Sequence, residues 1–348
     1  MTPTGPRDAS GDAPGVVDVV ALGESMVTFR PARPGRLADV PSFERGIGGA
    51  ESNVACVLAA AGHSTRWVSR VGDDPFGDHL VETIGGYGVD VAHVRRDPGR
   101  PTGIYFRTAG DRSGDAHEVA YYRTGSAASA MSVTDPGPDA VRAGRVLHLS
   151  GITAALSGTC LDLMRELTAR RPGRPLISFD VNHRPGLWRD NDAATVLRDL
   201  ARGADLVFVG QDEAWGLHNP QEVRAALPEP EVLVVKQGAA GATVFQRRDV
   251  TFVPAPRVDV VAEVGAGDAF AAGFLSATLR ALPVRDRLRH GHLMAAAALT
   301  VPGDLATPPA REHADRLVAL DDAAWGRLRL GPGWTEGTQR ADEEVPTP

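Results

Sequence analysis

Short apolar runs alternate with segments of helical character over the second half of the chain, and this rhythm limits the possible folds more than any other feature. The expected order is strand 146–149, helix 158–171, strand 176–181, helix 192–202, strand 206–209, helix 213–217 and strand 232–235. Strands that alternate with helices predict a parallel sheet whose two faces are both covered. The apolar run at 16–22 predicts a buried first strand, and 241–245 with 250–253 predict a hairpin at the sheet edge.

Four short segments earlier in the chain do not follow this rhythm. They are residues 25–30, 40–45, 102–108 and 118–123, which have mixed polar and apolar positions. Such paired segments predict a separate sheet with one solvated face. We therefore expect an α/β fold, with a mainly parallel sheet, helices on both faces, and a small β-sheet lid from about 24–46 and 101–124. The other expected elements are helices 54–61, 73–84, 284–301 and 312–320 and strands 65–69 and 89–94.

The length of 348 residues allows one large α/β domain with short additions. We expect this domain to span 16–330. Residues 1–15 are rich in Pro, Gly, Asp and Thr and predict a flexible leader, without the basic-then-apolar order of a secretion signal. Residues 331–348 turn to Gly, Thr, Glu and Pro and predict a disordered tail.

The charge balance argues against a nucleic-acid partner. Lys and Arg total 37 against 44 Asp and Glu, for a net charge of -7, and no local basic run stands out. No segment approaches the roughly 20 apolar residues that a membrane span needs, so no membrane partner is expected. Cys56 and Cys160 lie far apart without a metal-binding or redox spacing, which favours a reducing compartment. These features predict a soluble, cytoplasmic protein.

Residues 263–270, Glu-Val-Gly-Ala-Gly-Asp-Ala-Phe, carry the strongest chemical pattern. Gly265, Ala266 and Gly267 stand where an irregular approach becomes a helix, so several backbone N–H groups can point outward together and bind an anion. Asp268 falls in the first helical turn, where the helix dipole favours a carboxylate, and we expect it to be ionised near neutral pH. An anion cradle beside a carboxylate suits phosphoryl transfer. Taken alone, the octapeptide fits an ordinary glycine-rich helix start equally well.

A second glycine-rich motif and three groups of polar residues accompany this one. Gly-Gly-Ala-Glu-Ser-Asn at 48–53 leads into an alanine-rich helix, and its glycine pair lets a ligand approach the backbone. Residues 180–184 follow one predicted strand, 210–213 the next, and 236–241 the third. Because ligands of open α/β sheets lie at the carboxyl ends of the strands, we expect these polar groups to converge on one edge of the sheet.

Taken together, these segments resemble the ribokinase-like family of carbohydrate kinases. Residues 48–53 look like the family's sugar-contact motif and 264–270 like its catalytic motif, and the two in this order are much more specific than either alone. The resemblance covers roughly 17–320. The features most similar to the 2-keto-3-deoxygluconate kinases of that family are Tyr-Tyr-Arg at 121–123 with Gly-Ser-Ala-Ala at 125–128, Asp-Val-Asn-His-Arg-Pro at 180–185 with Leu-Trp at 187–188, and Ala50-Glu51 in the sugar-contact motif.

The resemblance implies phosphorylation of the terminal hydroxyl of a six-carbon keto acid with ATP and Mg²⁺. It implies that Asp268 is the catalytic base, with Gly265, Ala266 and Gly267 as the anion hole. The residues implied to contact the sugar acid are Gly48, Gly49, Asn53, Tyr105, Tyr121, Arg123 and Arg184. Those implied to lie along the nucleotide are Lys236, Gly238 and Gly241, with Gly265 and Gly267, and Glu213 is implied as the metal-linked carboxylate. Lid sheets of this family often pair, which implies that a homodimer can form.

Arginine is the side chain best shaped to bind a carboxylate, which a keto acid has and fructose lacks. Arg123 and Arg184 would then be isolated positive charges in a protein of negative net charge. Each has another explanation, because Arg184 can tie down a loop and Arg123 can lie on the solvated face of a lid strand. Tyr105 and Tyr121 can be packing residues of the lid, and Lys236 can be a surface lysine at a strand end.

Two positions depart from the family pattern. Gly210 stands where the family commonly has Asn, which leaves Glu213 as the remaining member of a pair linked to magnesium and phosphate. Ala-Glu-Val at 262–264 stands where the family commonly has Asp-Thr-Thr, which weakens an expectation of potassium activation. Two alternatives stay open: a fructokinase or other ketose or nucleoside kinase of the same fold, and a non-catalytic sensor of a sugar acid or nucleotide.

Overall fold

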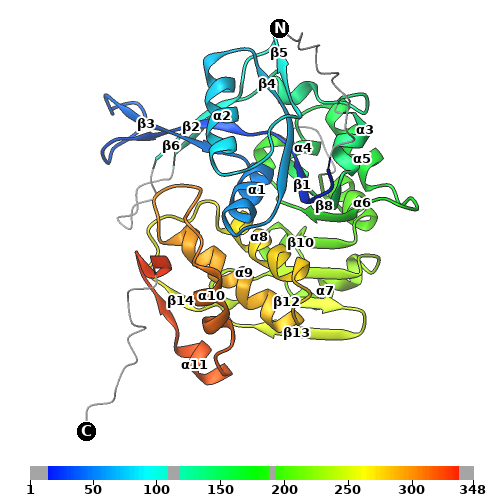
Figure 1. Cartoon of the computed structure of the whole chain (residues 1–348), viewed down its shortest axis with the longest axis vertical. Coiled ribbons are helices and arrows are strands. Elements are labelled where there is room, and N and C mark those ends of the chain that lie inside the picture. Colours follow the sequence, from blue (N-terminus) through cyan, green and yellow to red (C-terminus); the bar gives the residue numbers. More distant parts are fainter. Residues whose placement is uncertain (1–14, 109–117, 136, 189–192, 337–348) are drawn as a thin grey trace, which may run out of the picture.

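A nine-stranded sheet forms the centre of the fold (Figure 1), in the order β13-β12-β11-β10-β9-β8-β1-β4-β5. The computed structural model describes residues 15–108, 118–135, 137–188 and 193–336. The strands are β1 (Val17–Leu22), β4 (Thr65–Gly72), β5 (Val94–Asp97), β8 (Gly144–Ser150), β9 (Leu176–Asp180), β10 (Leu206–Gly210), β11 (Val232–Lys236), β12 (Ala242–Gln246) and β13 (Asp249–Val253). Neighbours from β11 to β5 pair in parallel, whereas β12 pairs antiparallel with both β11 and β13. The predicted parallel sheet with an edge hairpin is therefore confirmed.

Helices cover both faces of this sheet because its strands alternate their apolar side chains. In β1, Val19 belongs to one hydrophobic cluster and Val20 to the other, and in β10 the same holds for Phe208 and Val207. The first face carries α1 (Ala50–Ala60), α8 (Ala266–Leu279), α9 (Val284–Leu299), α10 (Arg311–Val318) and α11 (Asp322–Arg327). The second face carries α3 (Pro138–Arg142), α4 (Gly151–Ala154), α5 (Gly158–Thr168), α6 (Ala193–Gly203) and α7 (Pro220–Ala226). The two-residue period of the buried strands thus produces the predicted three-layer arrangement.

A separate four-stranded sheet, the small sheet, lies beside the main one (Figure 1) in the order β3-β2-β6-β7. Its strands are β2 (Met26–Pro31), β3 (Phe43–Gly48), β6 (Ile104–Arg107) and β7 (Val119–Tyr122). On one face, Phe106 stacks on Phe29 with 4.9 Å between ring centroids, and Phe29 contacts Phe76 of α2 (Pro75–Gly86). Successive residues of a strand point to opposite faces. Tyr105 therefore lies on the other face, where its ring centroid is 5.4 Å from that of Tyr121. An aromatic cluster therefore packs one face of the small sheet on α2, and Tyr105 and Tyr121 lie on the opposite face.

The helix predicted at 213–217 is wrong. Gln211–Glu213 form a single 3₁₀ turn, after which Trp215 has φ 55 and Gly216 has φ 78. Two successive residues in the left-handed region end a right-handed helix. The helix of this segment is α7, which begins after Asn219 because the Asn219 side chain accepts a hydrogen bond from a backbone N–H of the first turn.

The remaining differences concern the ends of elements and short pairs. The strand predicted at 89–94 begins only at Val94. The parallel pair β14 (Arg257–Val258) and β15 (Arg329–Leu330) was not expected, and Trp334 beyond it packs into the cluster of the first face. Residues 1–14 of the leader predicted at 1–15 and residues 337–348 of the tail predicted at 331–348 lie outside the described residues. The described part of the tail, 331–336, contains the 3₁₀ turn Trp334–Glu336. Among the described helices, none combines the length and hydropathy of a membrane span.

Candidate active site

The carboxyl ends of three neighbouring strands meet the start of α8 on the first face of the sheet. β9 ends at Asp180, β10 at Gly210 and β11 at Lys236, with Gly210 and Lys236 as register partners. A Cβ added to Gly267 would lie 3.5 Å from Lys236 Nζ, so this lysine reaches the first turn of the helix. The predicted polar groups therefore converge at one edge of the sheet, as strand order in an open α/β sheet requires.

The residue that caps α8 must be glycine. Gly265 has φ 72, in the left-handed region that residues with a Cβ rarely adopt. A Cβ there would also lie 2.2 Å from the carbonyl oxygen of Asp304. The first N–H groups of a helix have no partners within it, and they stand at the positive end of its dipole. This turn thus presents backbone donors where an anion can bind.

Asp268 joins the two glycine-rich motifs. Its Oδ2 accepts a hydrogen bond of 2.8 Å from Asn53 Nδ2, a residue of the motif at 48–53. Burial raises the pKa of Asp268 to about 7 against the lowering effect of this hydrogen bond, and the nearby Asp180 carboxylate raises it as well. The expectation that the helix dipole keeps Asp268 ionised near neutral pH is therefore wrong, because loss of solvation outweighs the dipole.

Lys236 and Arg184 bring positive charge to this edge, and both are paired. Lys236 Nζ donates to the two carboxylate oxygens of Asp180 at 3.1 and 2.9 Å. Arg184 Nη1 donates to Glu213 Oε1 at 3.2 Å, and Glu213 Oε2 accepts from the backbone N–H of Gly210 at 2.9 Å. Burial alone would lower the pKa of Lys236, but the carboxylates of Asp180 and Glu213 raise it above its ordinary value; burial also raises the pKa of Glu213. Arg184 is therefore not an isolated charge, and Lys236 is not a free surface lysine.

The motif at 48–53 approaches the small sheet and the loop after α9. A Cβ on Gly48 would lie 2.4 Å from both Tyr105 Oη and Asp304 Oδ2. Tyr105 Oη donates to Asp304 Oδ2 at 2.7 Å, and Arg107 Nη2 donates to Asp304 Oδ1 at 2.8 Å. Asp304 escaped the sequence analysis because it follows no strand and belongs to no spaced motif. It links the two groups of site residues, since its carboxylate lies at Gly48 and its carbonyl oxygen at Gly265.

Arg123 is buried and paired, so it is neither an isolated charge nor a residue of a solvated strand face. It is 9% exposed and forms an ion pair through Nη2 with Glu24, which also accepts from Ser126 Oγ. Its guanidinium carbon lies 5.9 Å from the ring centroid of Tyr121, and Tyr121 itself is 52% exposed. Gly49, the cap of α1, packs on the backbone of Glu24, where a Cβ would lie 2.4 Å from the carbonyl oxygen. Glu24 therefore supports both Arg123 and the glycine pair, although nothing in the sequence marks it as buried.

Glu51 is a second buried carboxyl that sequence reasoning did not place in the site. Its Oε1 accepts from Ser150 Oγ at 2.8 Å and from Thr153 Oγ1 at 2.7 Å, whereas its Oε2 has no partner within the described residues. Burial raises the pKa of Glu51. These hydrogen bonds connect the first turn of α1 to the end of β8 and to α4, and they hold the motif at 48–53 in place.

Gly238 begins the 3₁₀ turn Gly238–Ala240 and Gly241 follows it, with Gln237 between the turn and Lys236. The backbone N–H of Gln237 donates to the carbonyl oxygen of Gly241 at 2.9 Å, which closes the turn at the end of β11. The two glycines therefore lie at the same edge of the sheet as Asp180 and Lys236.

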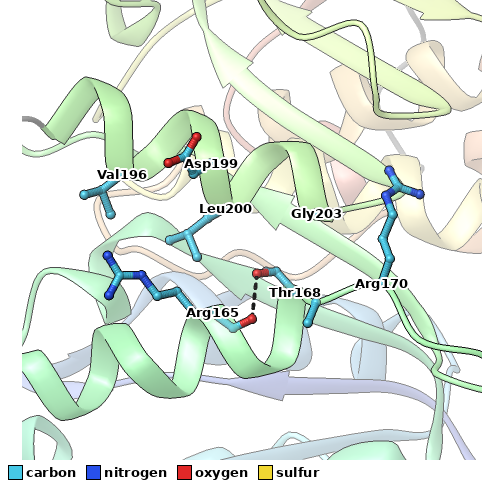
Figure 2. Close-up of a pocket in the computed structure, with 8 residues that line it drawn as sticks. Arg165, Thr168, Arg170, Val196, Asp199, Leu200 and Gly203 are labelled. Carbon is cyan, nitrogen blue, oxygen red and sulfur yellow. Dashed lines mark hydrogen bonds between the residues drawn. The ribbon is translucent and has the colours of Figure 1, made fainter.

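A cavity of about 210 Å³ lies elsewhere, between α5 and α6 (Figure 2). It is lined by Arg165, Thr168, Ala169, Arg170, Val196, Asp199, Leu200 and Gly203. Thr168 Oγ1 bonds back to the carbonyl oxygen of Arg165 at 3.4 Å, as Figure 2 shows. Thr168 and Gly203 end helices that lead into the amino ends of β9 and β10, so this cavity lies at the opposite edge of the sheet and shares no residue with the site.

A parallel α/β sheet, backbone donors at a helix start and an adjacent carboxyl with a raised pKa are together typical of enzymes that transfer a phosphoryl group. The family model of pfkB family carbohydrate kinases matches residues 17–311, and the chain belongs to this family.

Individual relatives agree with this assignment. The chain is 35% identical over 316 residues to a 2-dehydro-3-deoxygluconokinase of Thermoproteus tenax, covering 88% of this chain and 96% of the relative. The crystal structure of a 2-dehydro-3-deoxygluconokinase of Thermotoga maritima is similar with a TM-score of 0.79 at 25% identity, covering 87% and 99% of the two chains. An uncharacterized sugar kinase of Pyrococcus horikoshii, solved in complex with ATP, gives 0.75 at 26% identity, covering 88% and 99%. Because 2-dehydro-3-deoxygluconate is another name for 2-keto-3-deoxygluconate, the predicted resemblance is confirmed.

Proposed function

We propose that this carbohydrate kinase transfers the γ-phosphoryl group of ATP to a hydroxyl of a sugar acid, 2-keto-3-deoxygluconate, with Asp268 as general base. The observation that carries the proposal is the hydrogen bond between Asp268 and Asn53, which joins the start of α8 to the motif at 48–53. The names of the Thermoproteus tenax and Thermotoga maritima relatives support the acceptor, and the ATP complex of the Pyrococcus horikoshii protein supports the donor.

In this mechanism the acceptor hydroxyl oxygen forms a bond to the γ-phosphorus while the bond to the β–γ bridging oxygen breaks, and ADP leaves. The hydroxyl proton passes to Asp268. Its Oδ2 is held by Asn53, which leaves Oδ1 to face the hydroxyl. The backbone N–H groups that follow Gly265 stabilise charge on the moving phosphoryl oxygens, and Lys236 adds a positive charge beside them.

Magnesium, which the family implies, fits this site through one carboxylate. Among the residues that the structure describes, no group of three or more His, Cys, Asp or Glu side chains is arranged to hold a metal ion. Mg²⁺ is commonly held by one or two carboxylates together with substrate phosphates. Each oxygen of Glu213 accepts one hydrogen bond and keeps a lone pair for a metal or a water. When bound, the ion would neutralise charge on the phosphates.

An acceptor panel tests the proposed function. Purified protein with ATP and Mg²⁺ should phosphorylate 2-keto-3-deoxygluconate with a kcat/KM at least about tenfold above that for fructose or ribose, because a bound carboxylate adds about 1.4 kcal/mol or more to binding. The galactonate epimer belongs in the same panel. If ATP binds but no acceptor is phosphorylated, the protein is a sensor and not a kinase of these sugars.

A neutral ketose is the second candidate acceptor, and the pairing of Arg123 favours it. Glu24 already neutralises Arg123, so that guanidinium is not a free partner for a substrate carboxylate. A fructokinase would accept fructose with the higher kcat/KM in the same panel. That result would replace the sugar acid in the proposal while leaving the role of Asp268 intact.

Arg184→Ala separates these acceptors. The Arg184 side chain is 52% exposed and meets Glu213 at 3.2 Å, so it can turn toward a carboxylate more readily than Arg123 can. Its loss should raise KM for the keto acid by about 10- to 100-fold, as expected for a charged hydrogen bond, and leave KM for fructose within about threefold. Arg202→Ala is the matched control, because Arg202 is 46% exposed and paired with Asp199. An equal rise of KM for both sugars would show that Arg184 does not recognise the acid group.

The same proposal places the protein in the cytoplasm and includes a homodimer through the small sheet. Cys56 and Cys160 are both buried free thiols, which suits a reducing compartment. β7 is an edge strand that exposes Tyr121 and Tyr122. Light scattering that finds only monomer at micromolar concentration would remove the dimer.

A further inference from the structure

Asp180 has no part in the mechanism described above, although it is only 2% exposed at the end of β9. Both of its carboxylate oxygens accept from Lys236 Nζ. A buried carboxylate is costly unless a partner compensates for its lost solvation. Lys236 is therefore the cation that allows Asp180 to be charged, and Asp180 in turn decides where the lysine ammonium stands.

The Lys236 ammonium lies at the first turn of α8, which we propose as the binding place of the phosphate anion. Nζ lies 3.5 Å from the position of a Cβ on Gly267, the second residue of α8. Three carboxyl groups, those of Asp180, Glu213 and Asp268, act on the charge of Lys236. A lysine has a flexible four-carbon stem and can turn among nearby partners. Only one of the three carboxyl groups holds it by hydrogen bonds in this structure.

The other two carboxyl groups differ in their freedom to take the lysine. Glu213 is engaged by Arg184 on one oxygen and by the backbone N–H of Gly210 on the other. Asp268 accepts one hydrogen bond from the described residues, from Asn53 Nδ2 to Oδ2. If Asp180 were removed, Asp268 would be the less engaged of the two, and an ion pair there would occupy the oxygen that should receive the proton.

We propose that Asp180 is a positioning residue for phosphoryl transfer, which holds the Lys236 ammonium at the Gly267 side of the anion cradle and away from Asp268. The inference rests on the kinase function proposed above. In this position the Lys236 ammonium can interact with the phosphoryl group and does not form an ion pair with Asp268, the proposed general base. Asp180 itself contacts no reacting atom and acts only by positioning Lys236.

A neighbouring polar pair offers a control that separates a positioning role of Asp180 from a merely structural one. Ser178 precedes Asp180 by two residues on the same face of β9, and its Oγ lies 3.0 Å from His148 Nδ1. Burial lowers the pKa of His148 to about 4, so this histidine is neutral at pH 7 and gives Asp180 no counter-charge. Ser178→Ala therefore disturbs the same layer without touching the Asp180–Lys236 pair, and it is the matched control.

Asp180→Asn, which keeps the side-chain volume, tests the proposal. We expect kcat to fall by about 10- to 100-fold while KM for sugar and for ATP stays within about threefold, since the loss falls on the transition state. In a Lys236→Met background, adding Asp180→Asn should cause little further loss. Ser178→Ala should keep kcat within about threefold of the parent. If Asp180→Asn lowered kcat by the same factor in the Lys236→Met background as in the parent, Asp180 would have only a structural role. The same conclusion would follow if Ser178→Ala lowered kcat as much as Asp180→Asn does.

The titration of Asp268 gives a second measurement that does not depend on turnover. Asn53, Asp180, Lys236 and Arg184 face this carboxyl, and the Asp180 charge raises its pKa. In ¹³C NMR of protein labelled at aspartate carboxyls, Asp180→Asn should therefore lower the Asp268 pKa by about one unit, with the resonance assigned by Asp268→Asn. In the Lys236→Met background the same substitution should lower this pKa by less, because only the loss of the Asp180 charge then contributes. Equal shifts in the two backgrounds would overturn the inference even in an active enzyme. If no acceptor is phosphorylated by the parent protein, the kinase function fails, while this titration still decides whether Asp180 holds the lysine away from Asp268.

Discussion

Asp268→Asn should lower kcat by about 10²- to 10⁴-fold, the usual contribution of a general base, while KM for the sugar stays within about threefold. Asparagine fills the same volume and keeps an oxygen that can accept from Asn53 Nδ2, so the motif at 48–53 should stay in place. The amide cannot take the hydroxyl proton. Steady-state kinetics at saturating ATP measures the effect, and near-normal turnover would remove Asp268 from the role of base.

The pH dependence of the same pair of proteins checks the assignment. Because burial raises the pKa of Asp268 to about 7 in the free protein, kcat/KM of the parent should rise with pH through a limb near pH 7, and the variant should lack this limb. A raised pKa means that the folded state binds the proton more tightly than the unfolded state, whose ordinary value is 3.8. Ionisation of Asp268 therefore costs stability as pH rises from about 4 to about 7. At pH 8 the variant should melt no earlier than the parent, and Asp199→Asn on α6 should change neither property.

Gly265→Ala should lower kcat/KM by at least about 100-fold, the usual cost of losing one backbone donor of an anion hole. The new Cβ would lie 2.2 Å from the carbonyl oxygen of Asp304, and alanine disfavours φ 72. Strain of this kind costs about 1–3 kcal/mol, so the melting temperature should fall as well. Single-turnover kinetics and thermal denaturation measure the two effects.

Gly158→Ala provides the control for this substitution. Gly158 also begins a helix, α5, but a Cβ there meets no atom within 4 Å. Its variant should keep both activity and stability. Parental kinetics in Gly265→Ala would show that the cap of α8 does not shape the phosphate end of the site.

Much of the fold was predictable because burial in strands follows a period of two and helices follow strands in a regular order. Val19 and Val20 show this locally, since adjacent residues belong to clusters on opposite faces of the sheet. The helix predicted at 213–217 failed because Trp215 adopts φ 55, a conformation that the surrounding structure imposes and that no local pattern announces. Composition and periodicity predict helices and strands well, but they predict the turns between them less well.

The proximity of some candidate residues was predictable, whereas the pairing of others was not. The family resemblance of the two glycine-rich motifs implied that Asn53 and Asp268 lie close together, and the structure joins them by a hydrogen bond. The partner of Arg123 was not predictable, because Glu24 becomes a partner only when both side chains are buried after distant segments meet. Burial likewise raises the pKa of Asp268, and the burial of a residue at a helix start cannot be read from one sequence.

Asp304 has a consequence for how the two substrates influence each other. Its carboxylate receives Tyr105 and Arg107 from β6, while its own backbone packs against Gly265 at the other end of the site. A displacement of β6 on closure over an acceptor would therefore shift the turn that we propose as the binding place of the donor phosphates. Thermodynamic linkage makes such coupling reciprocal, so nucleotide bound at that turn would in the same measure favour capture of the acceptor.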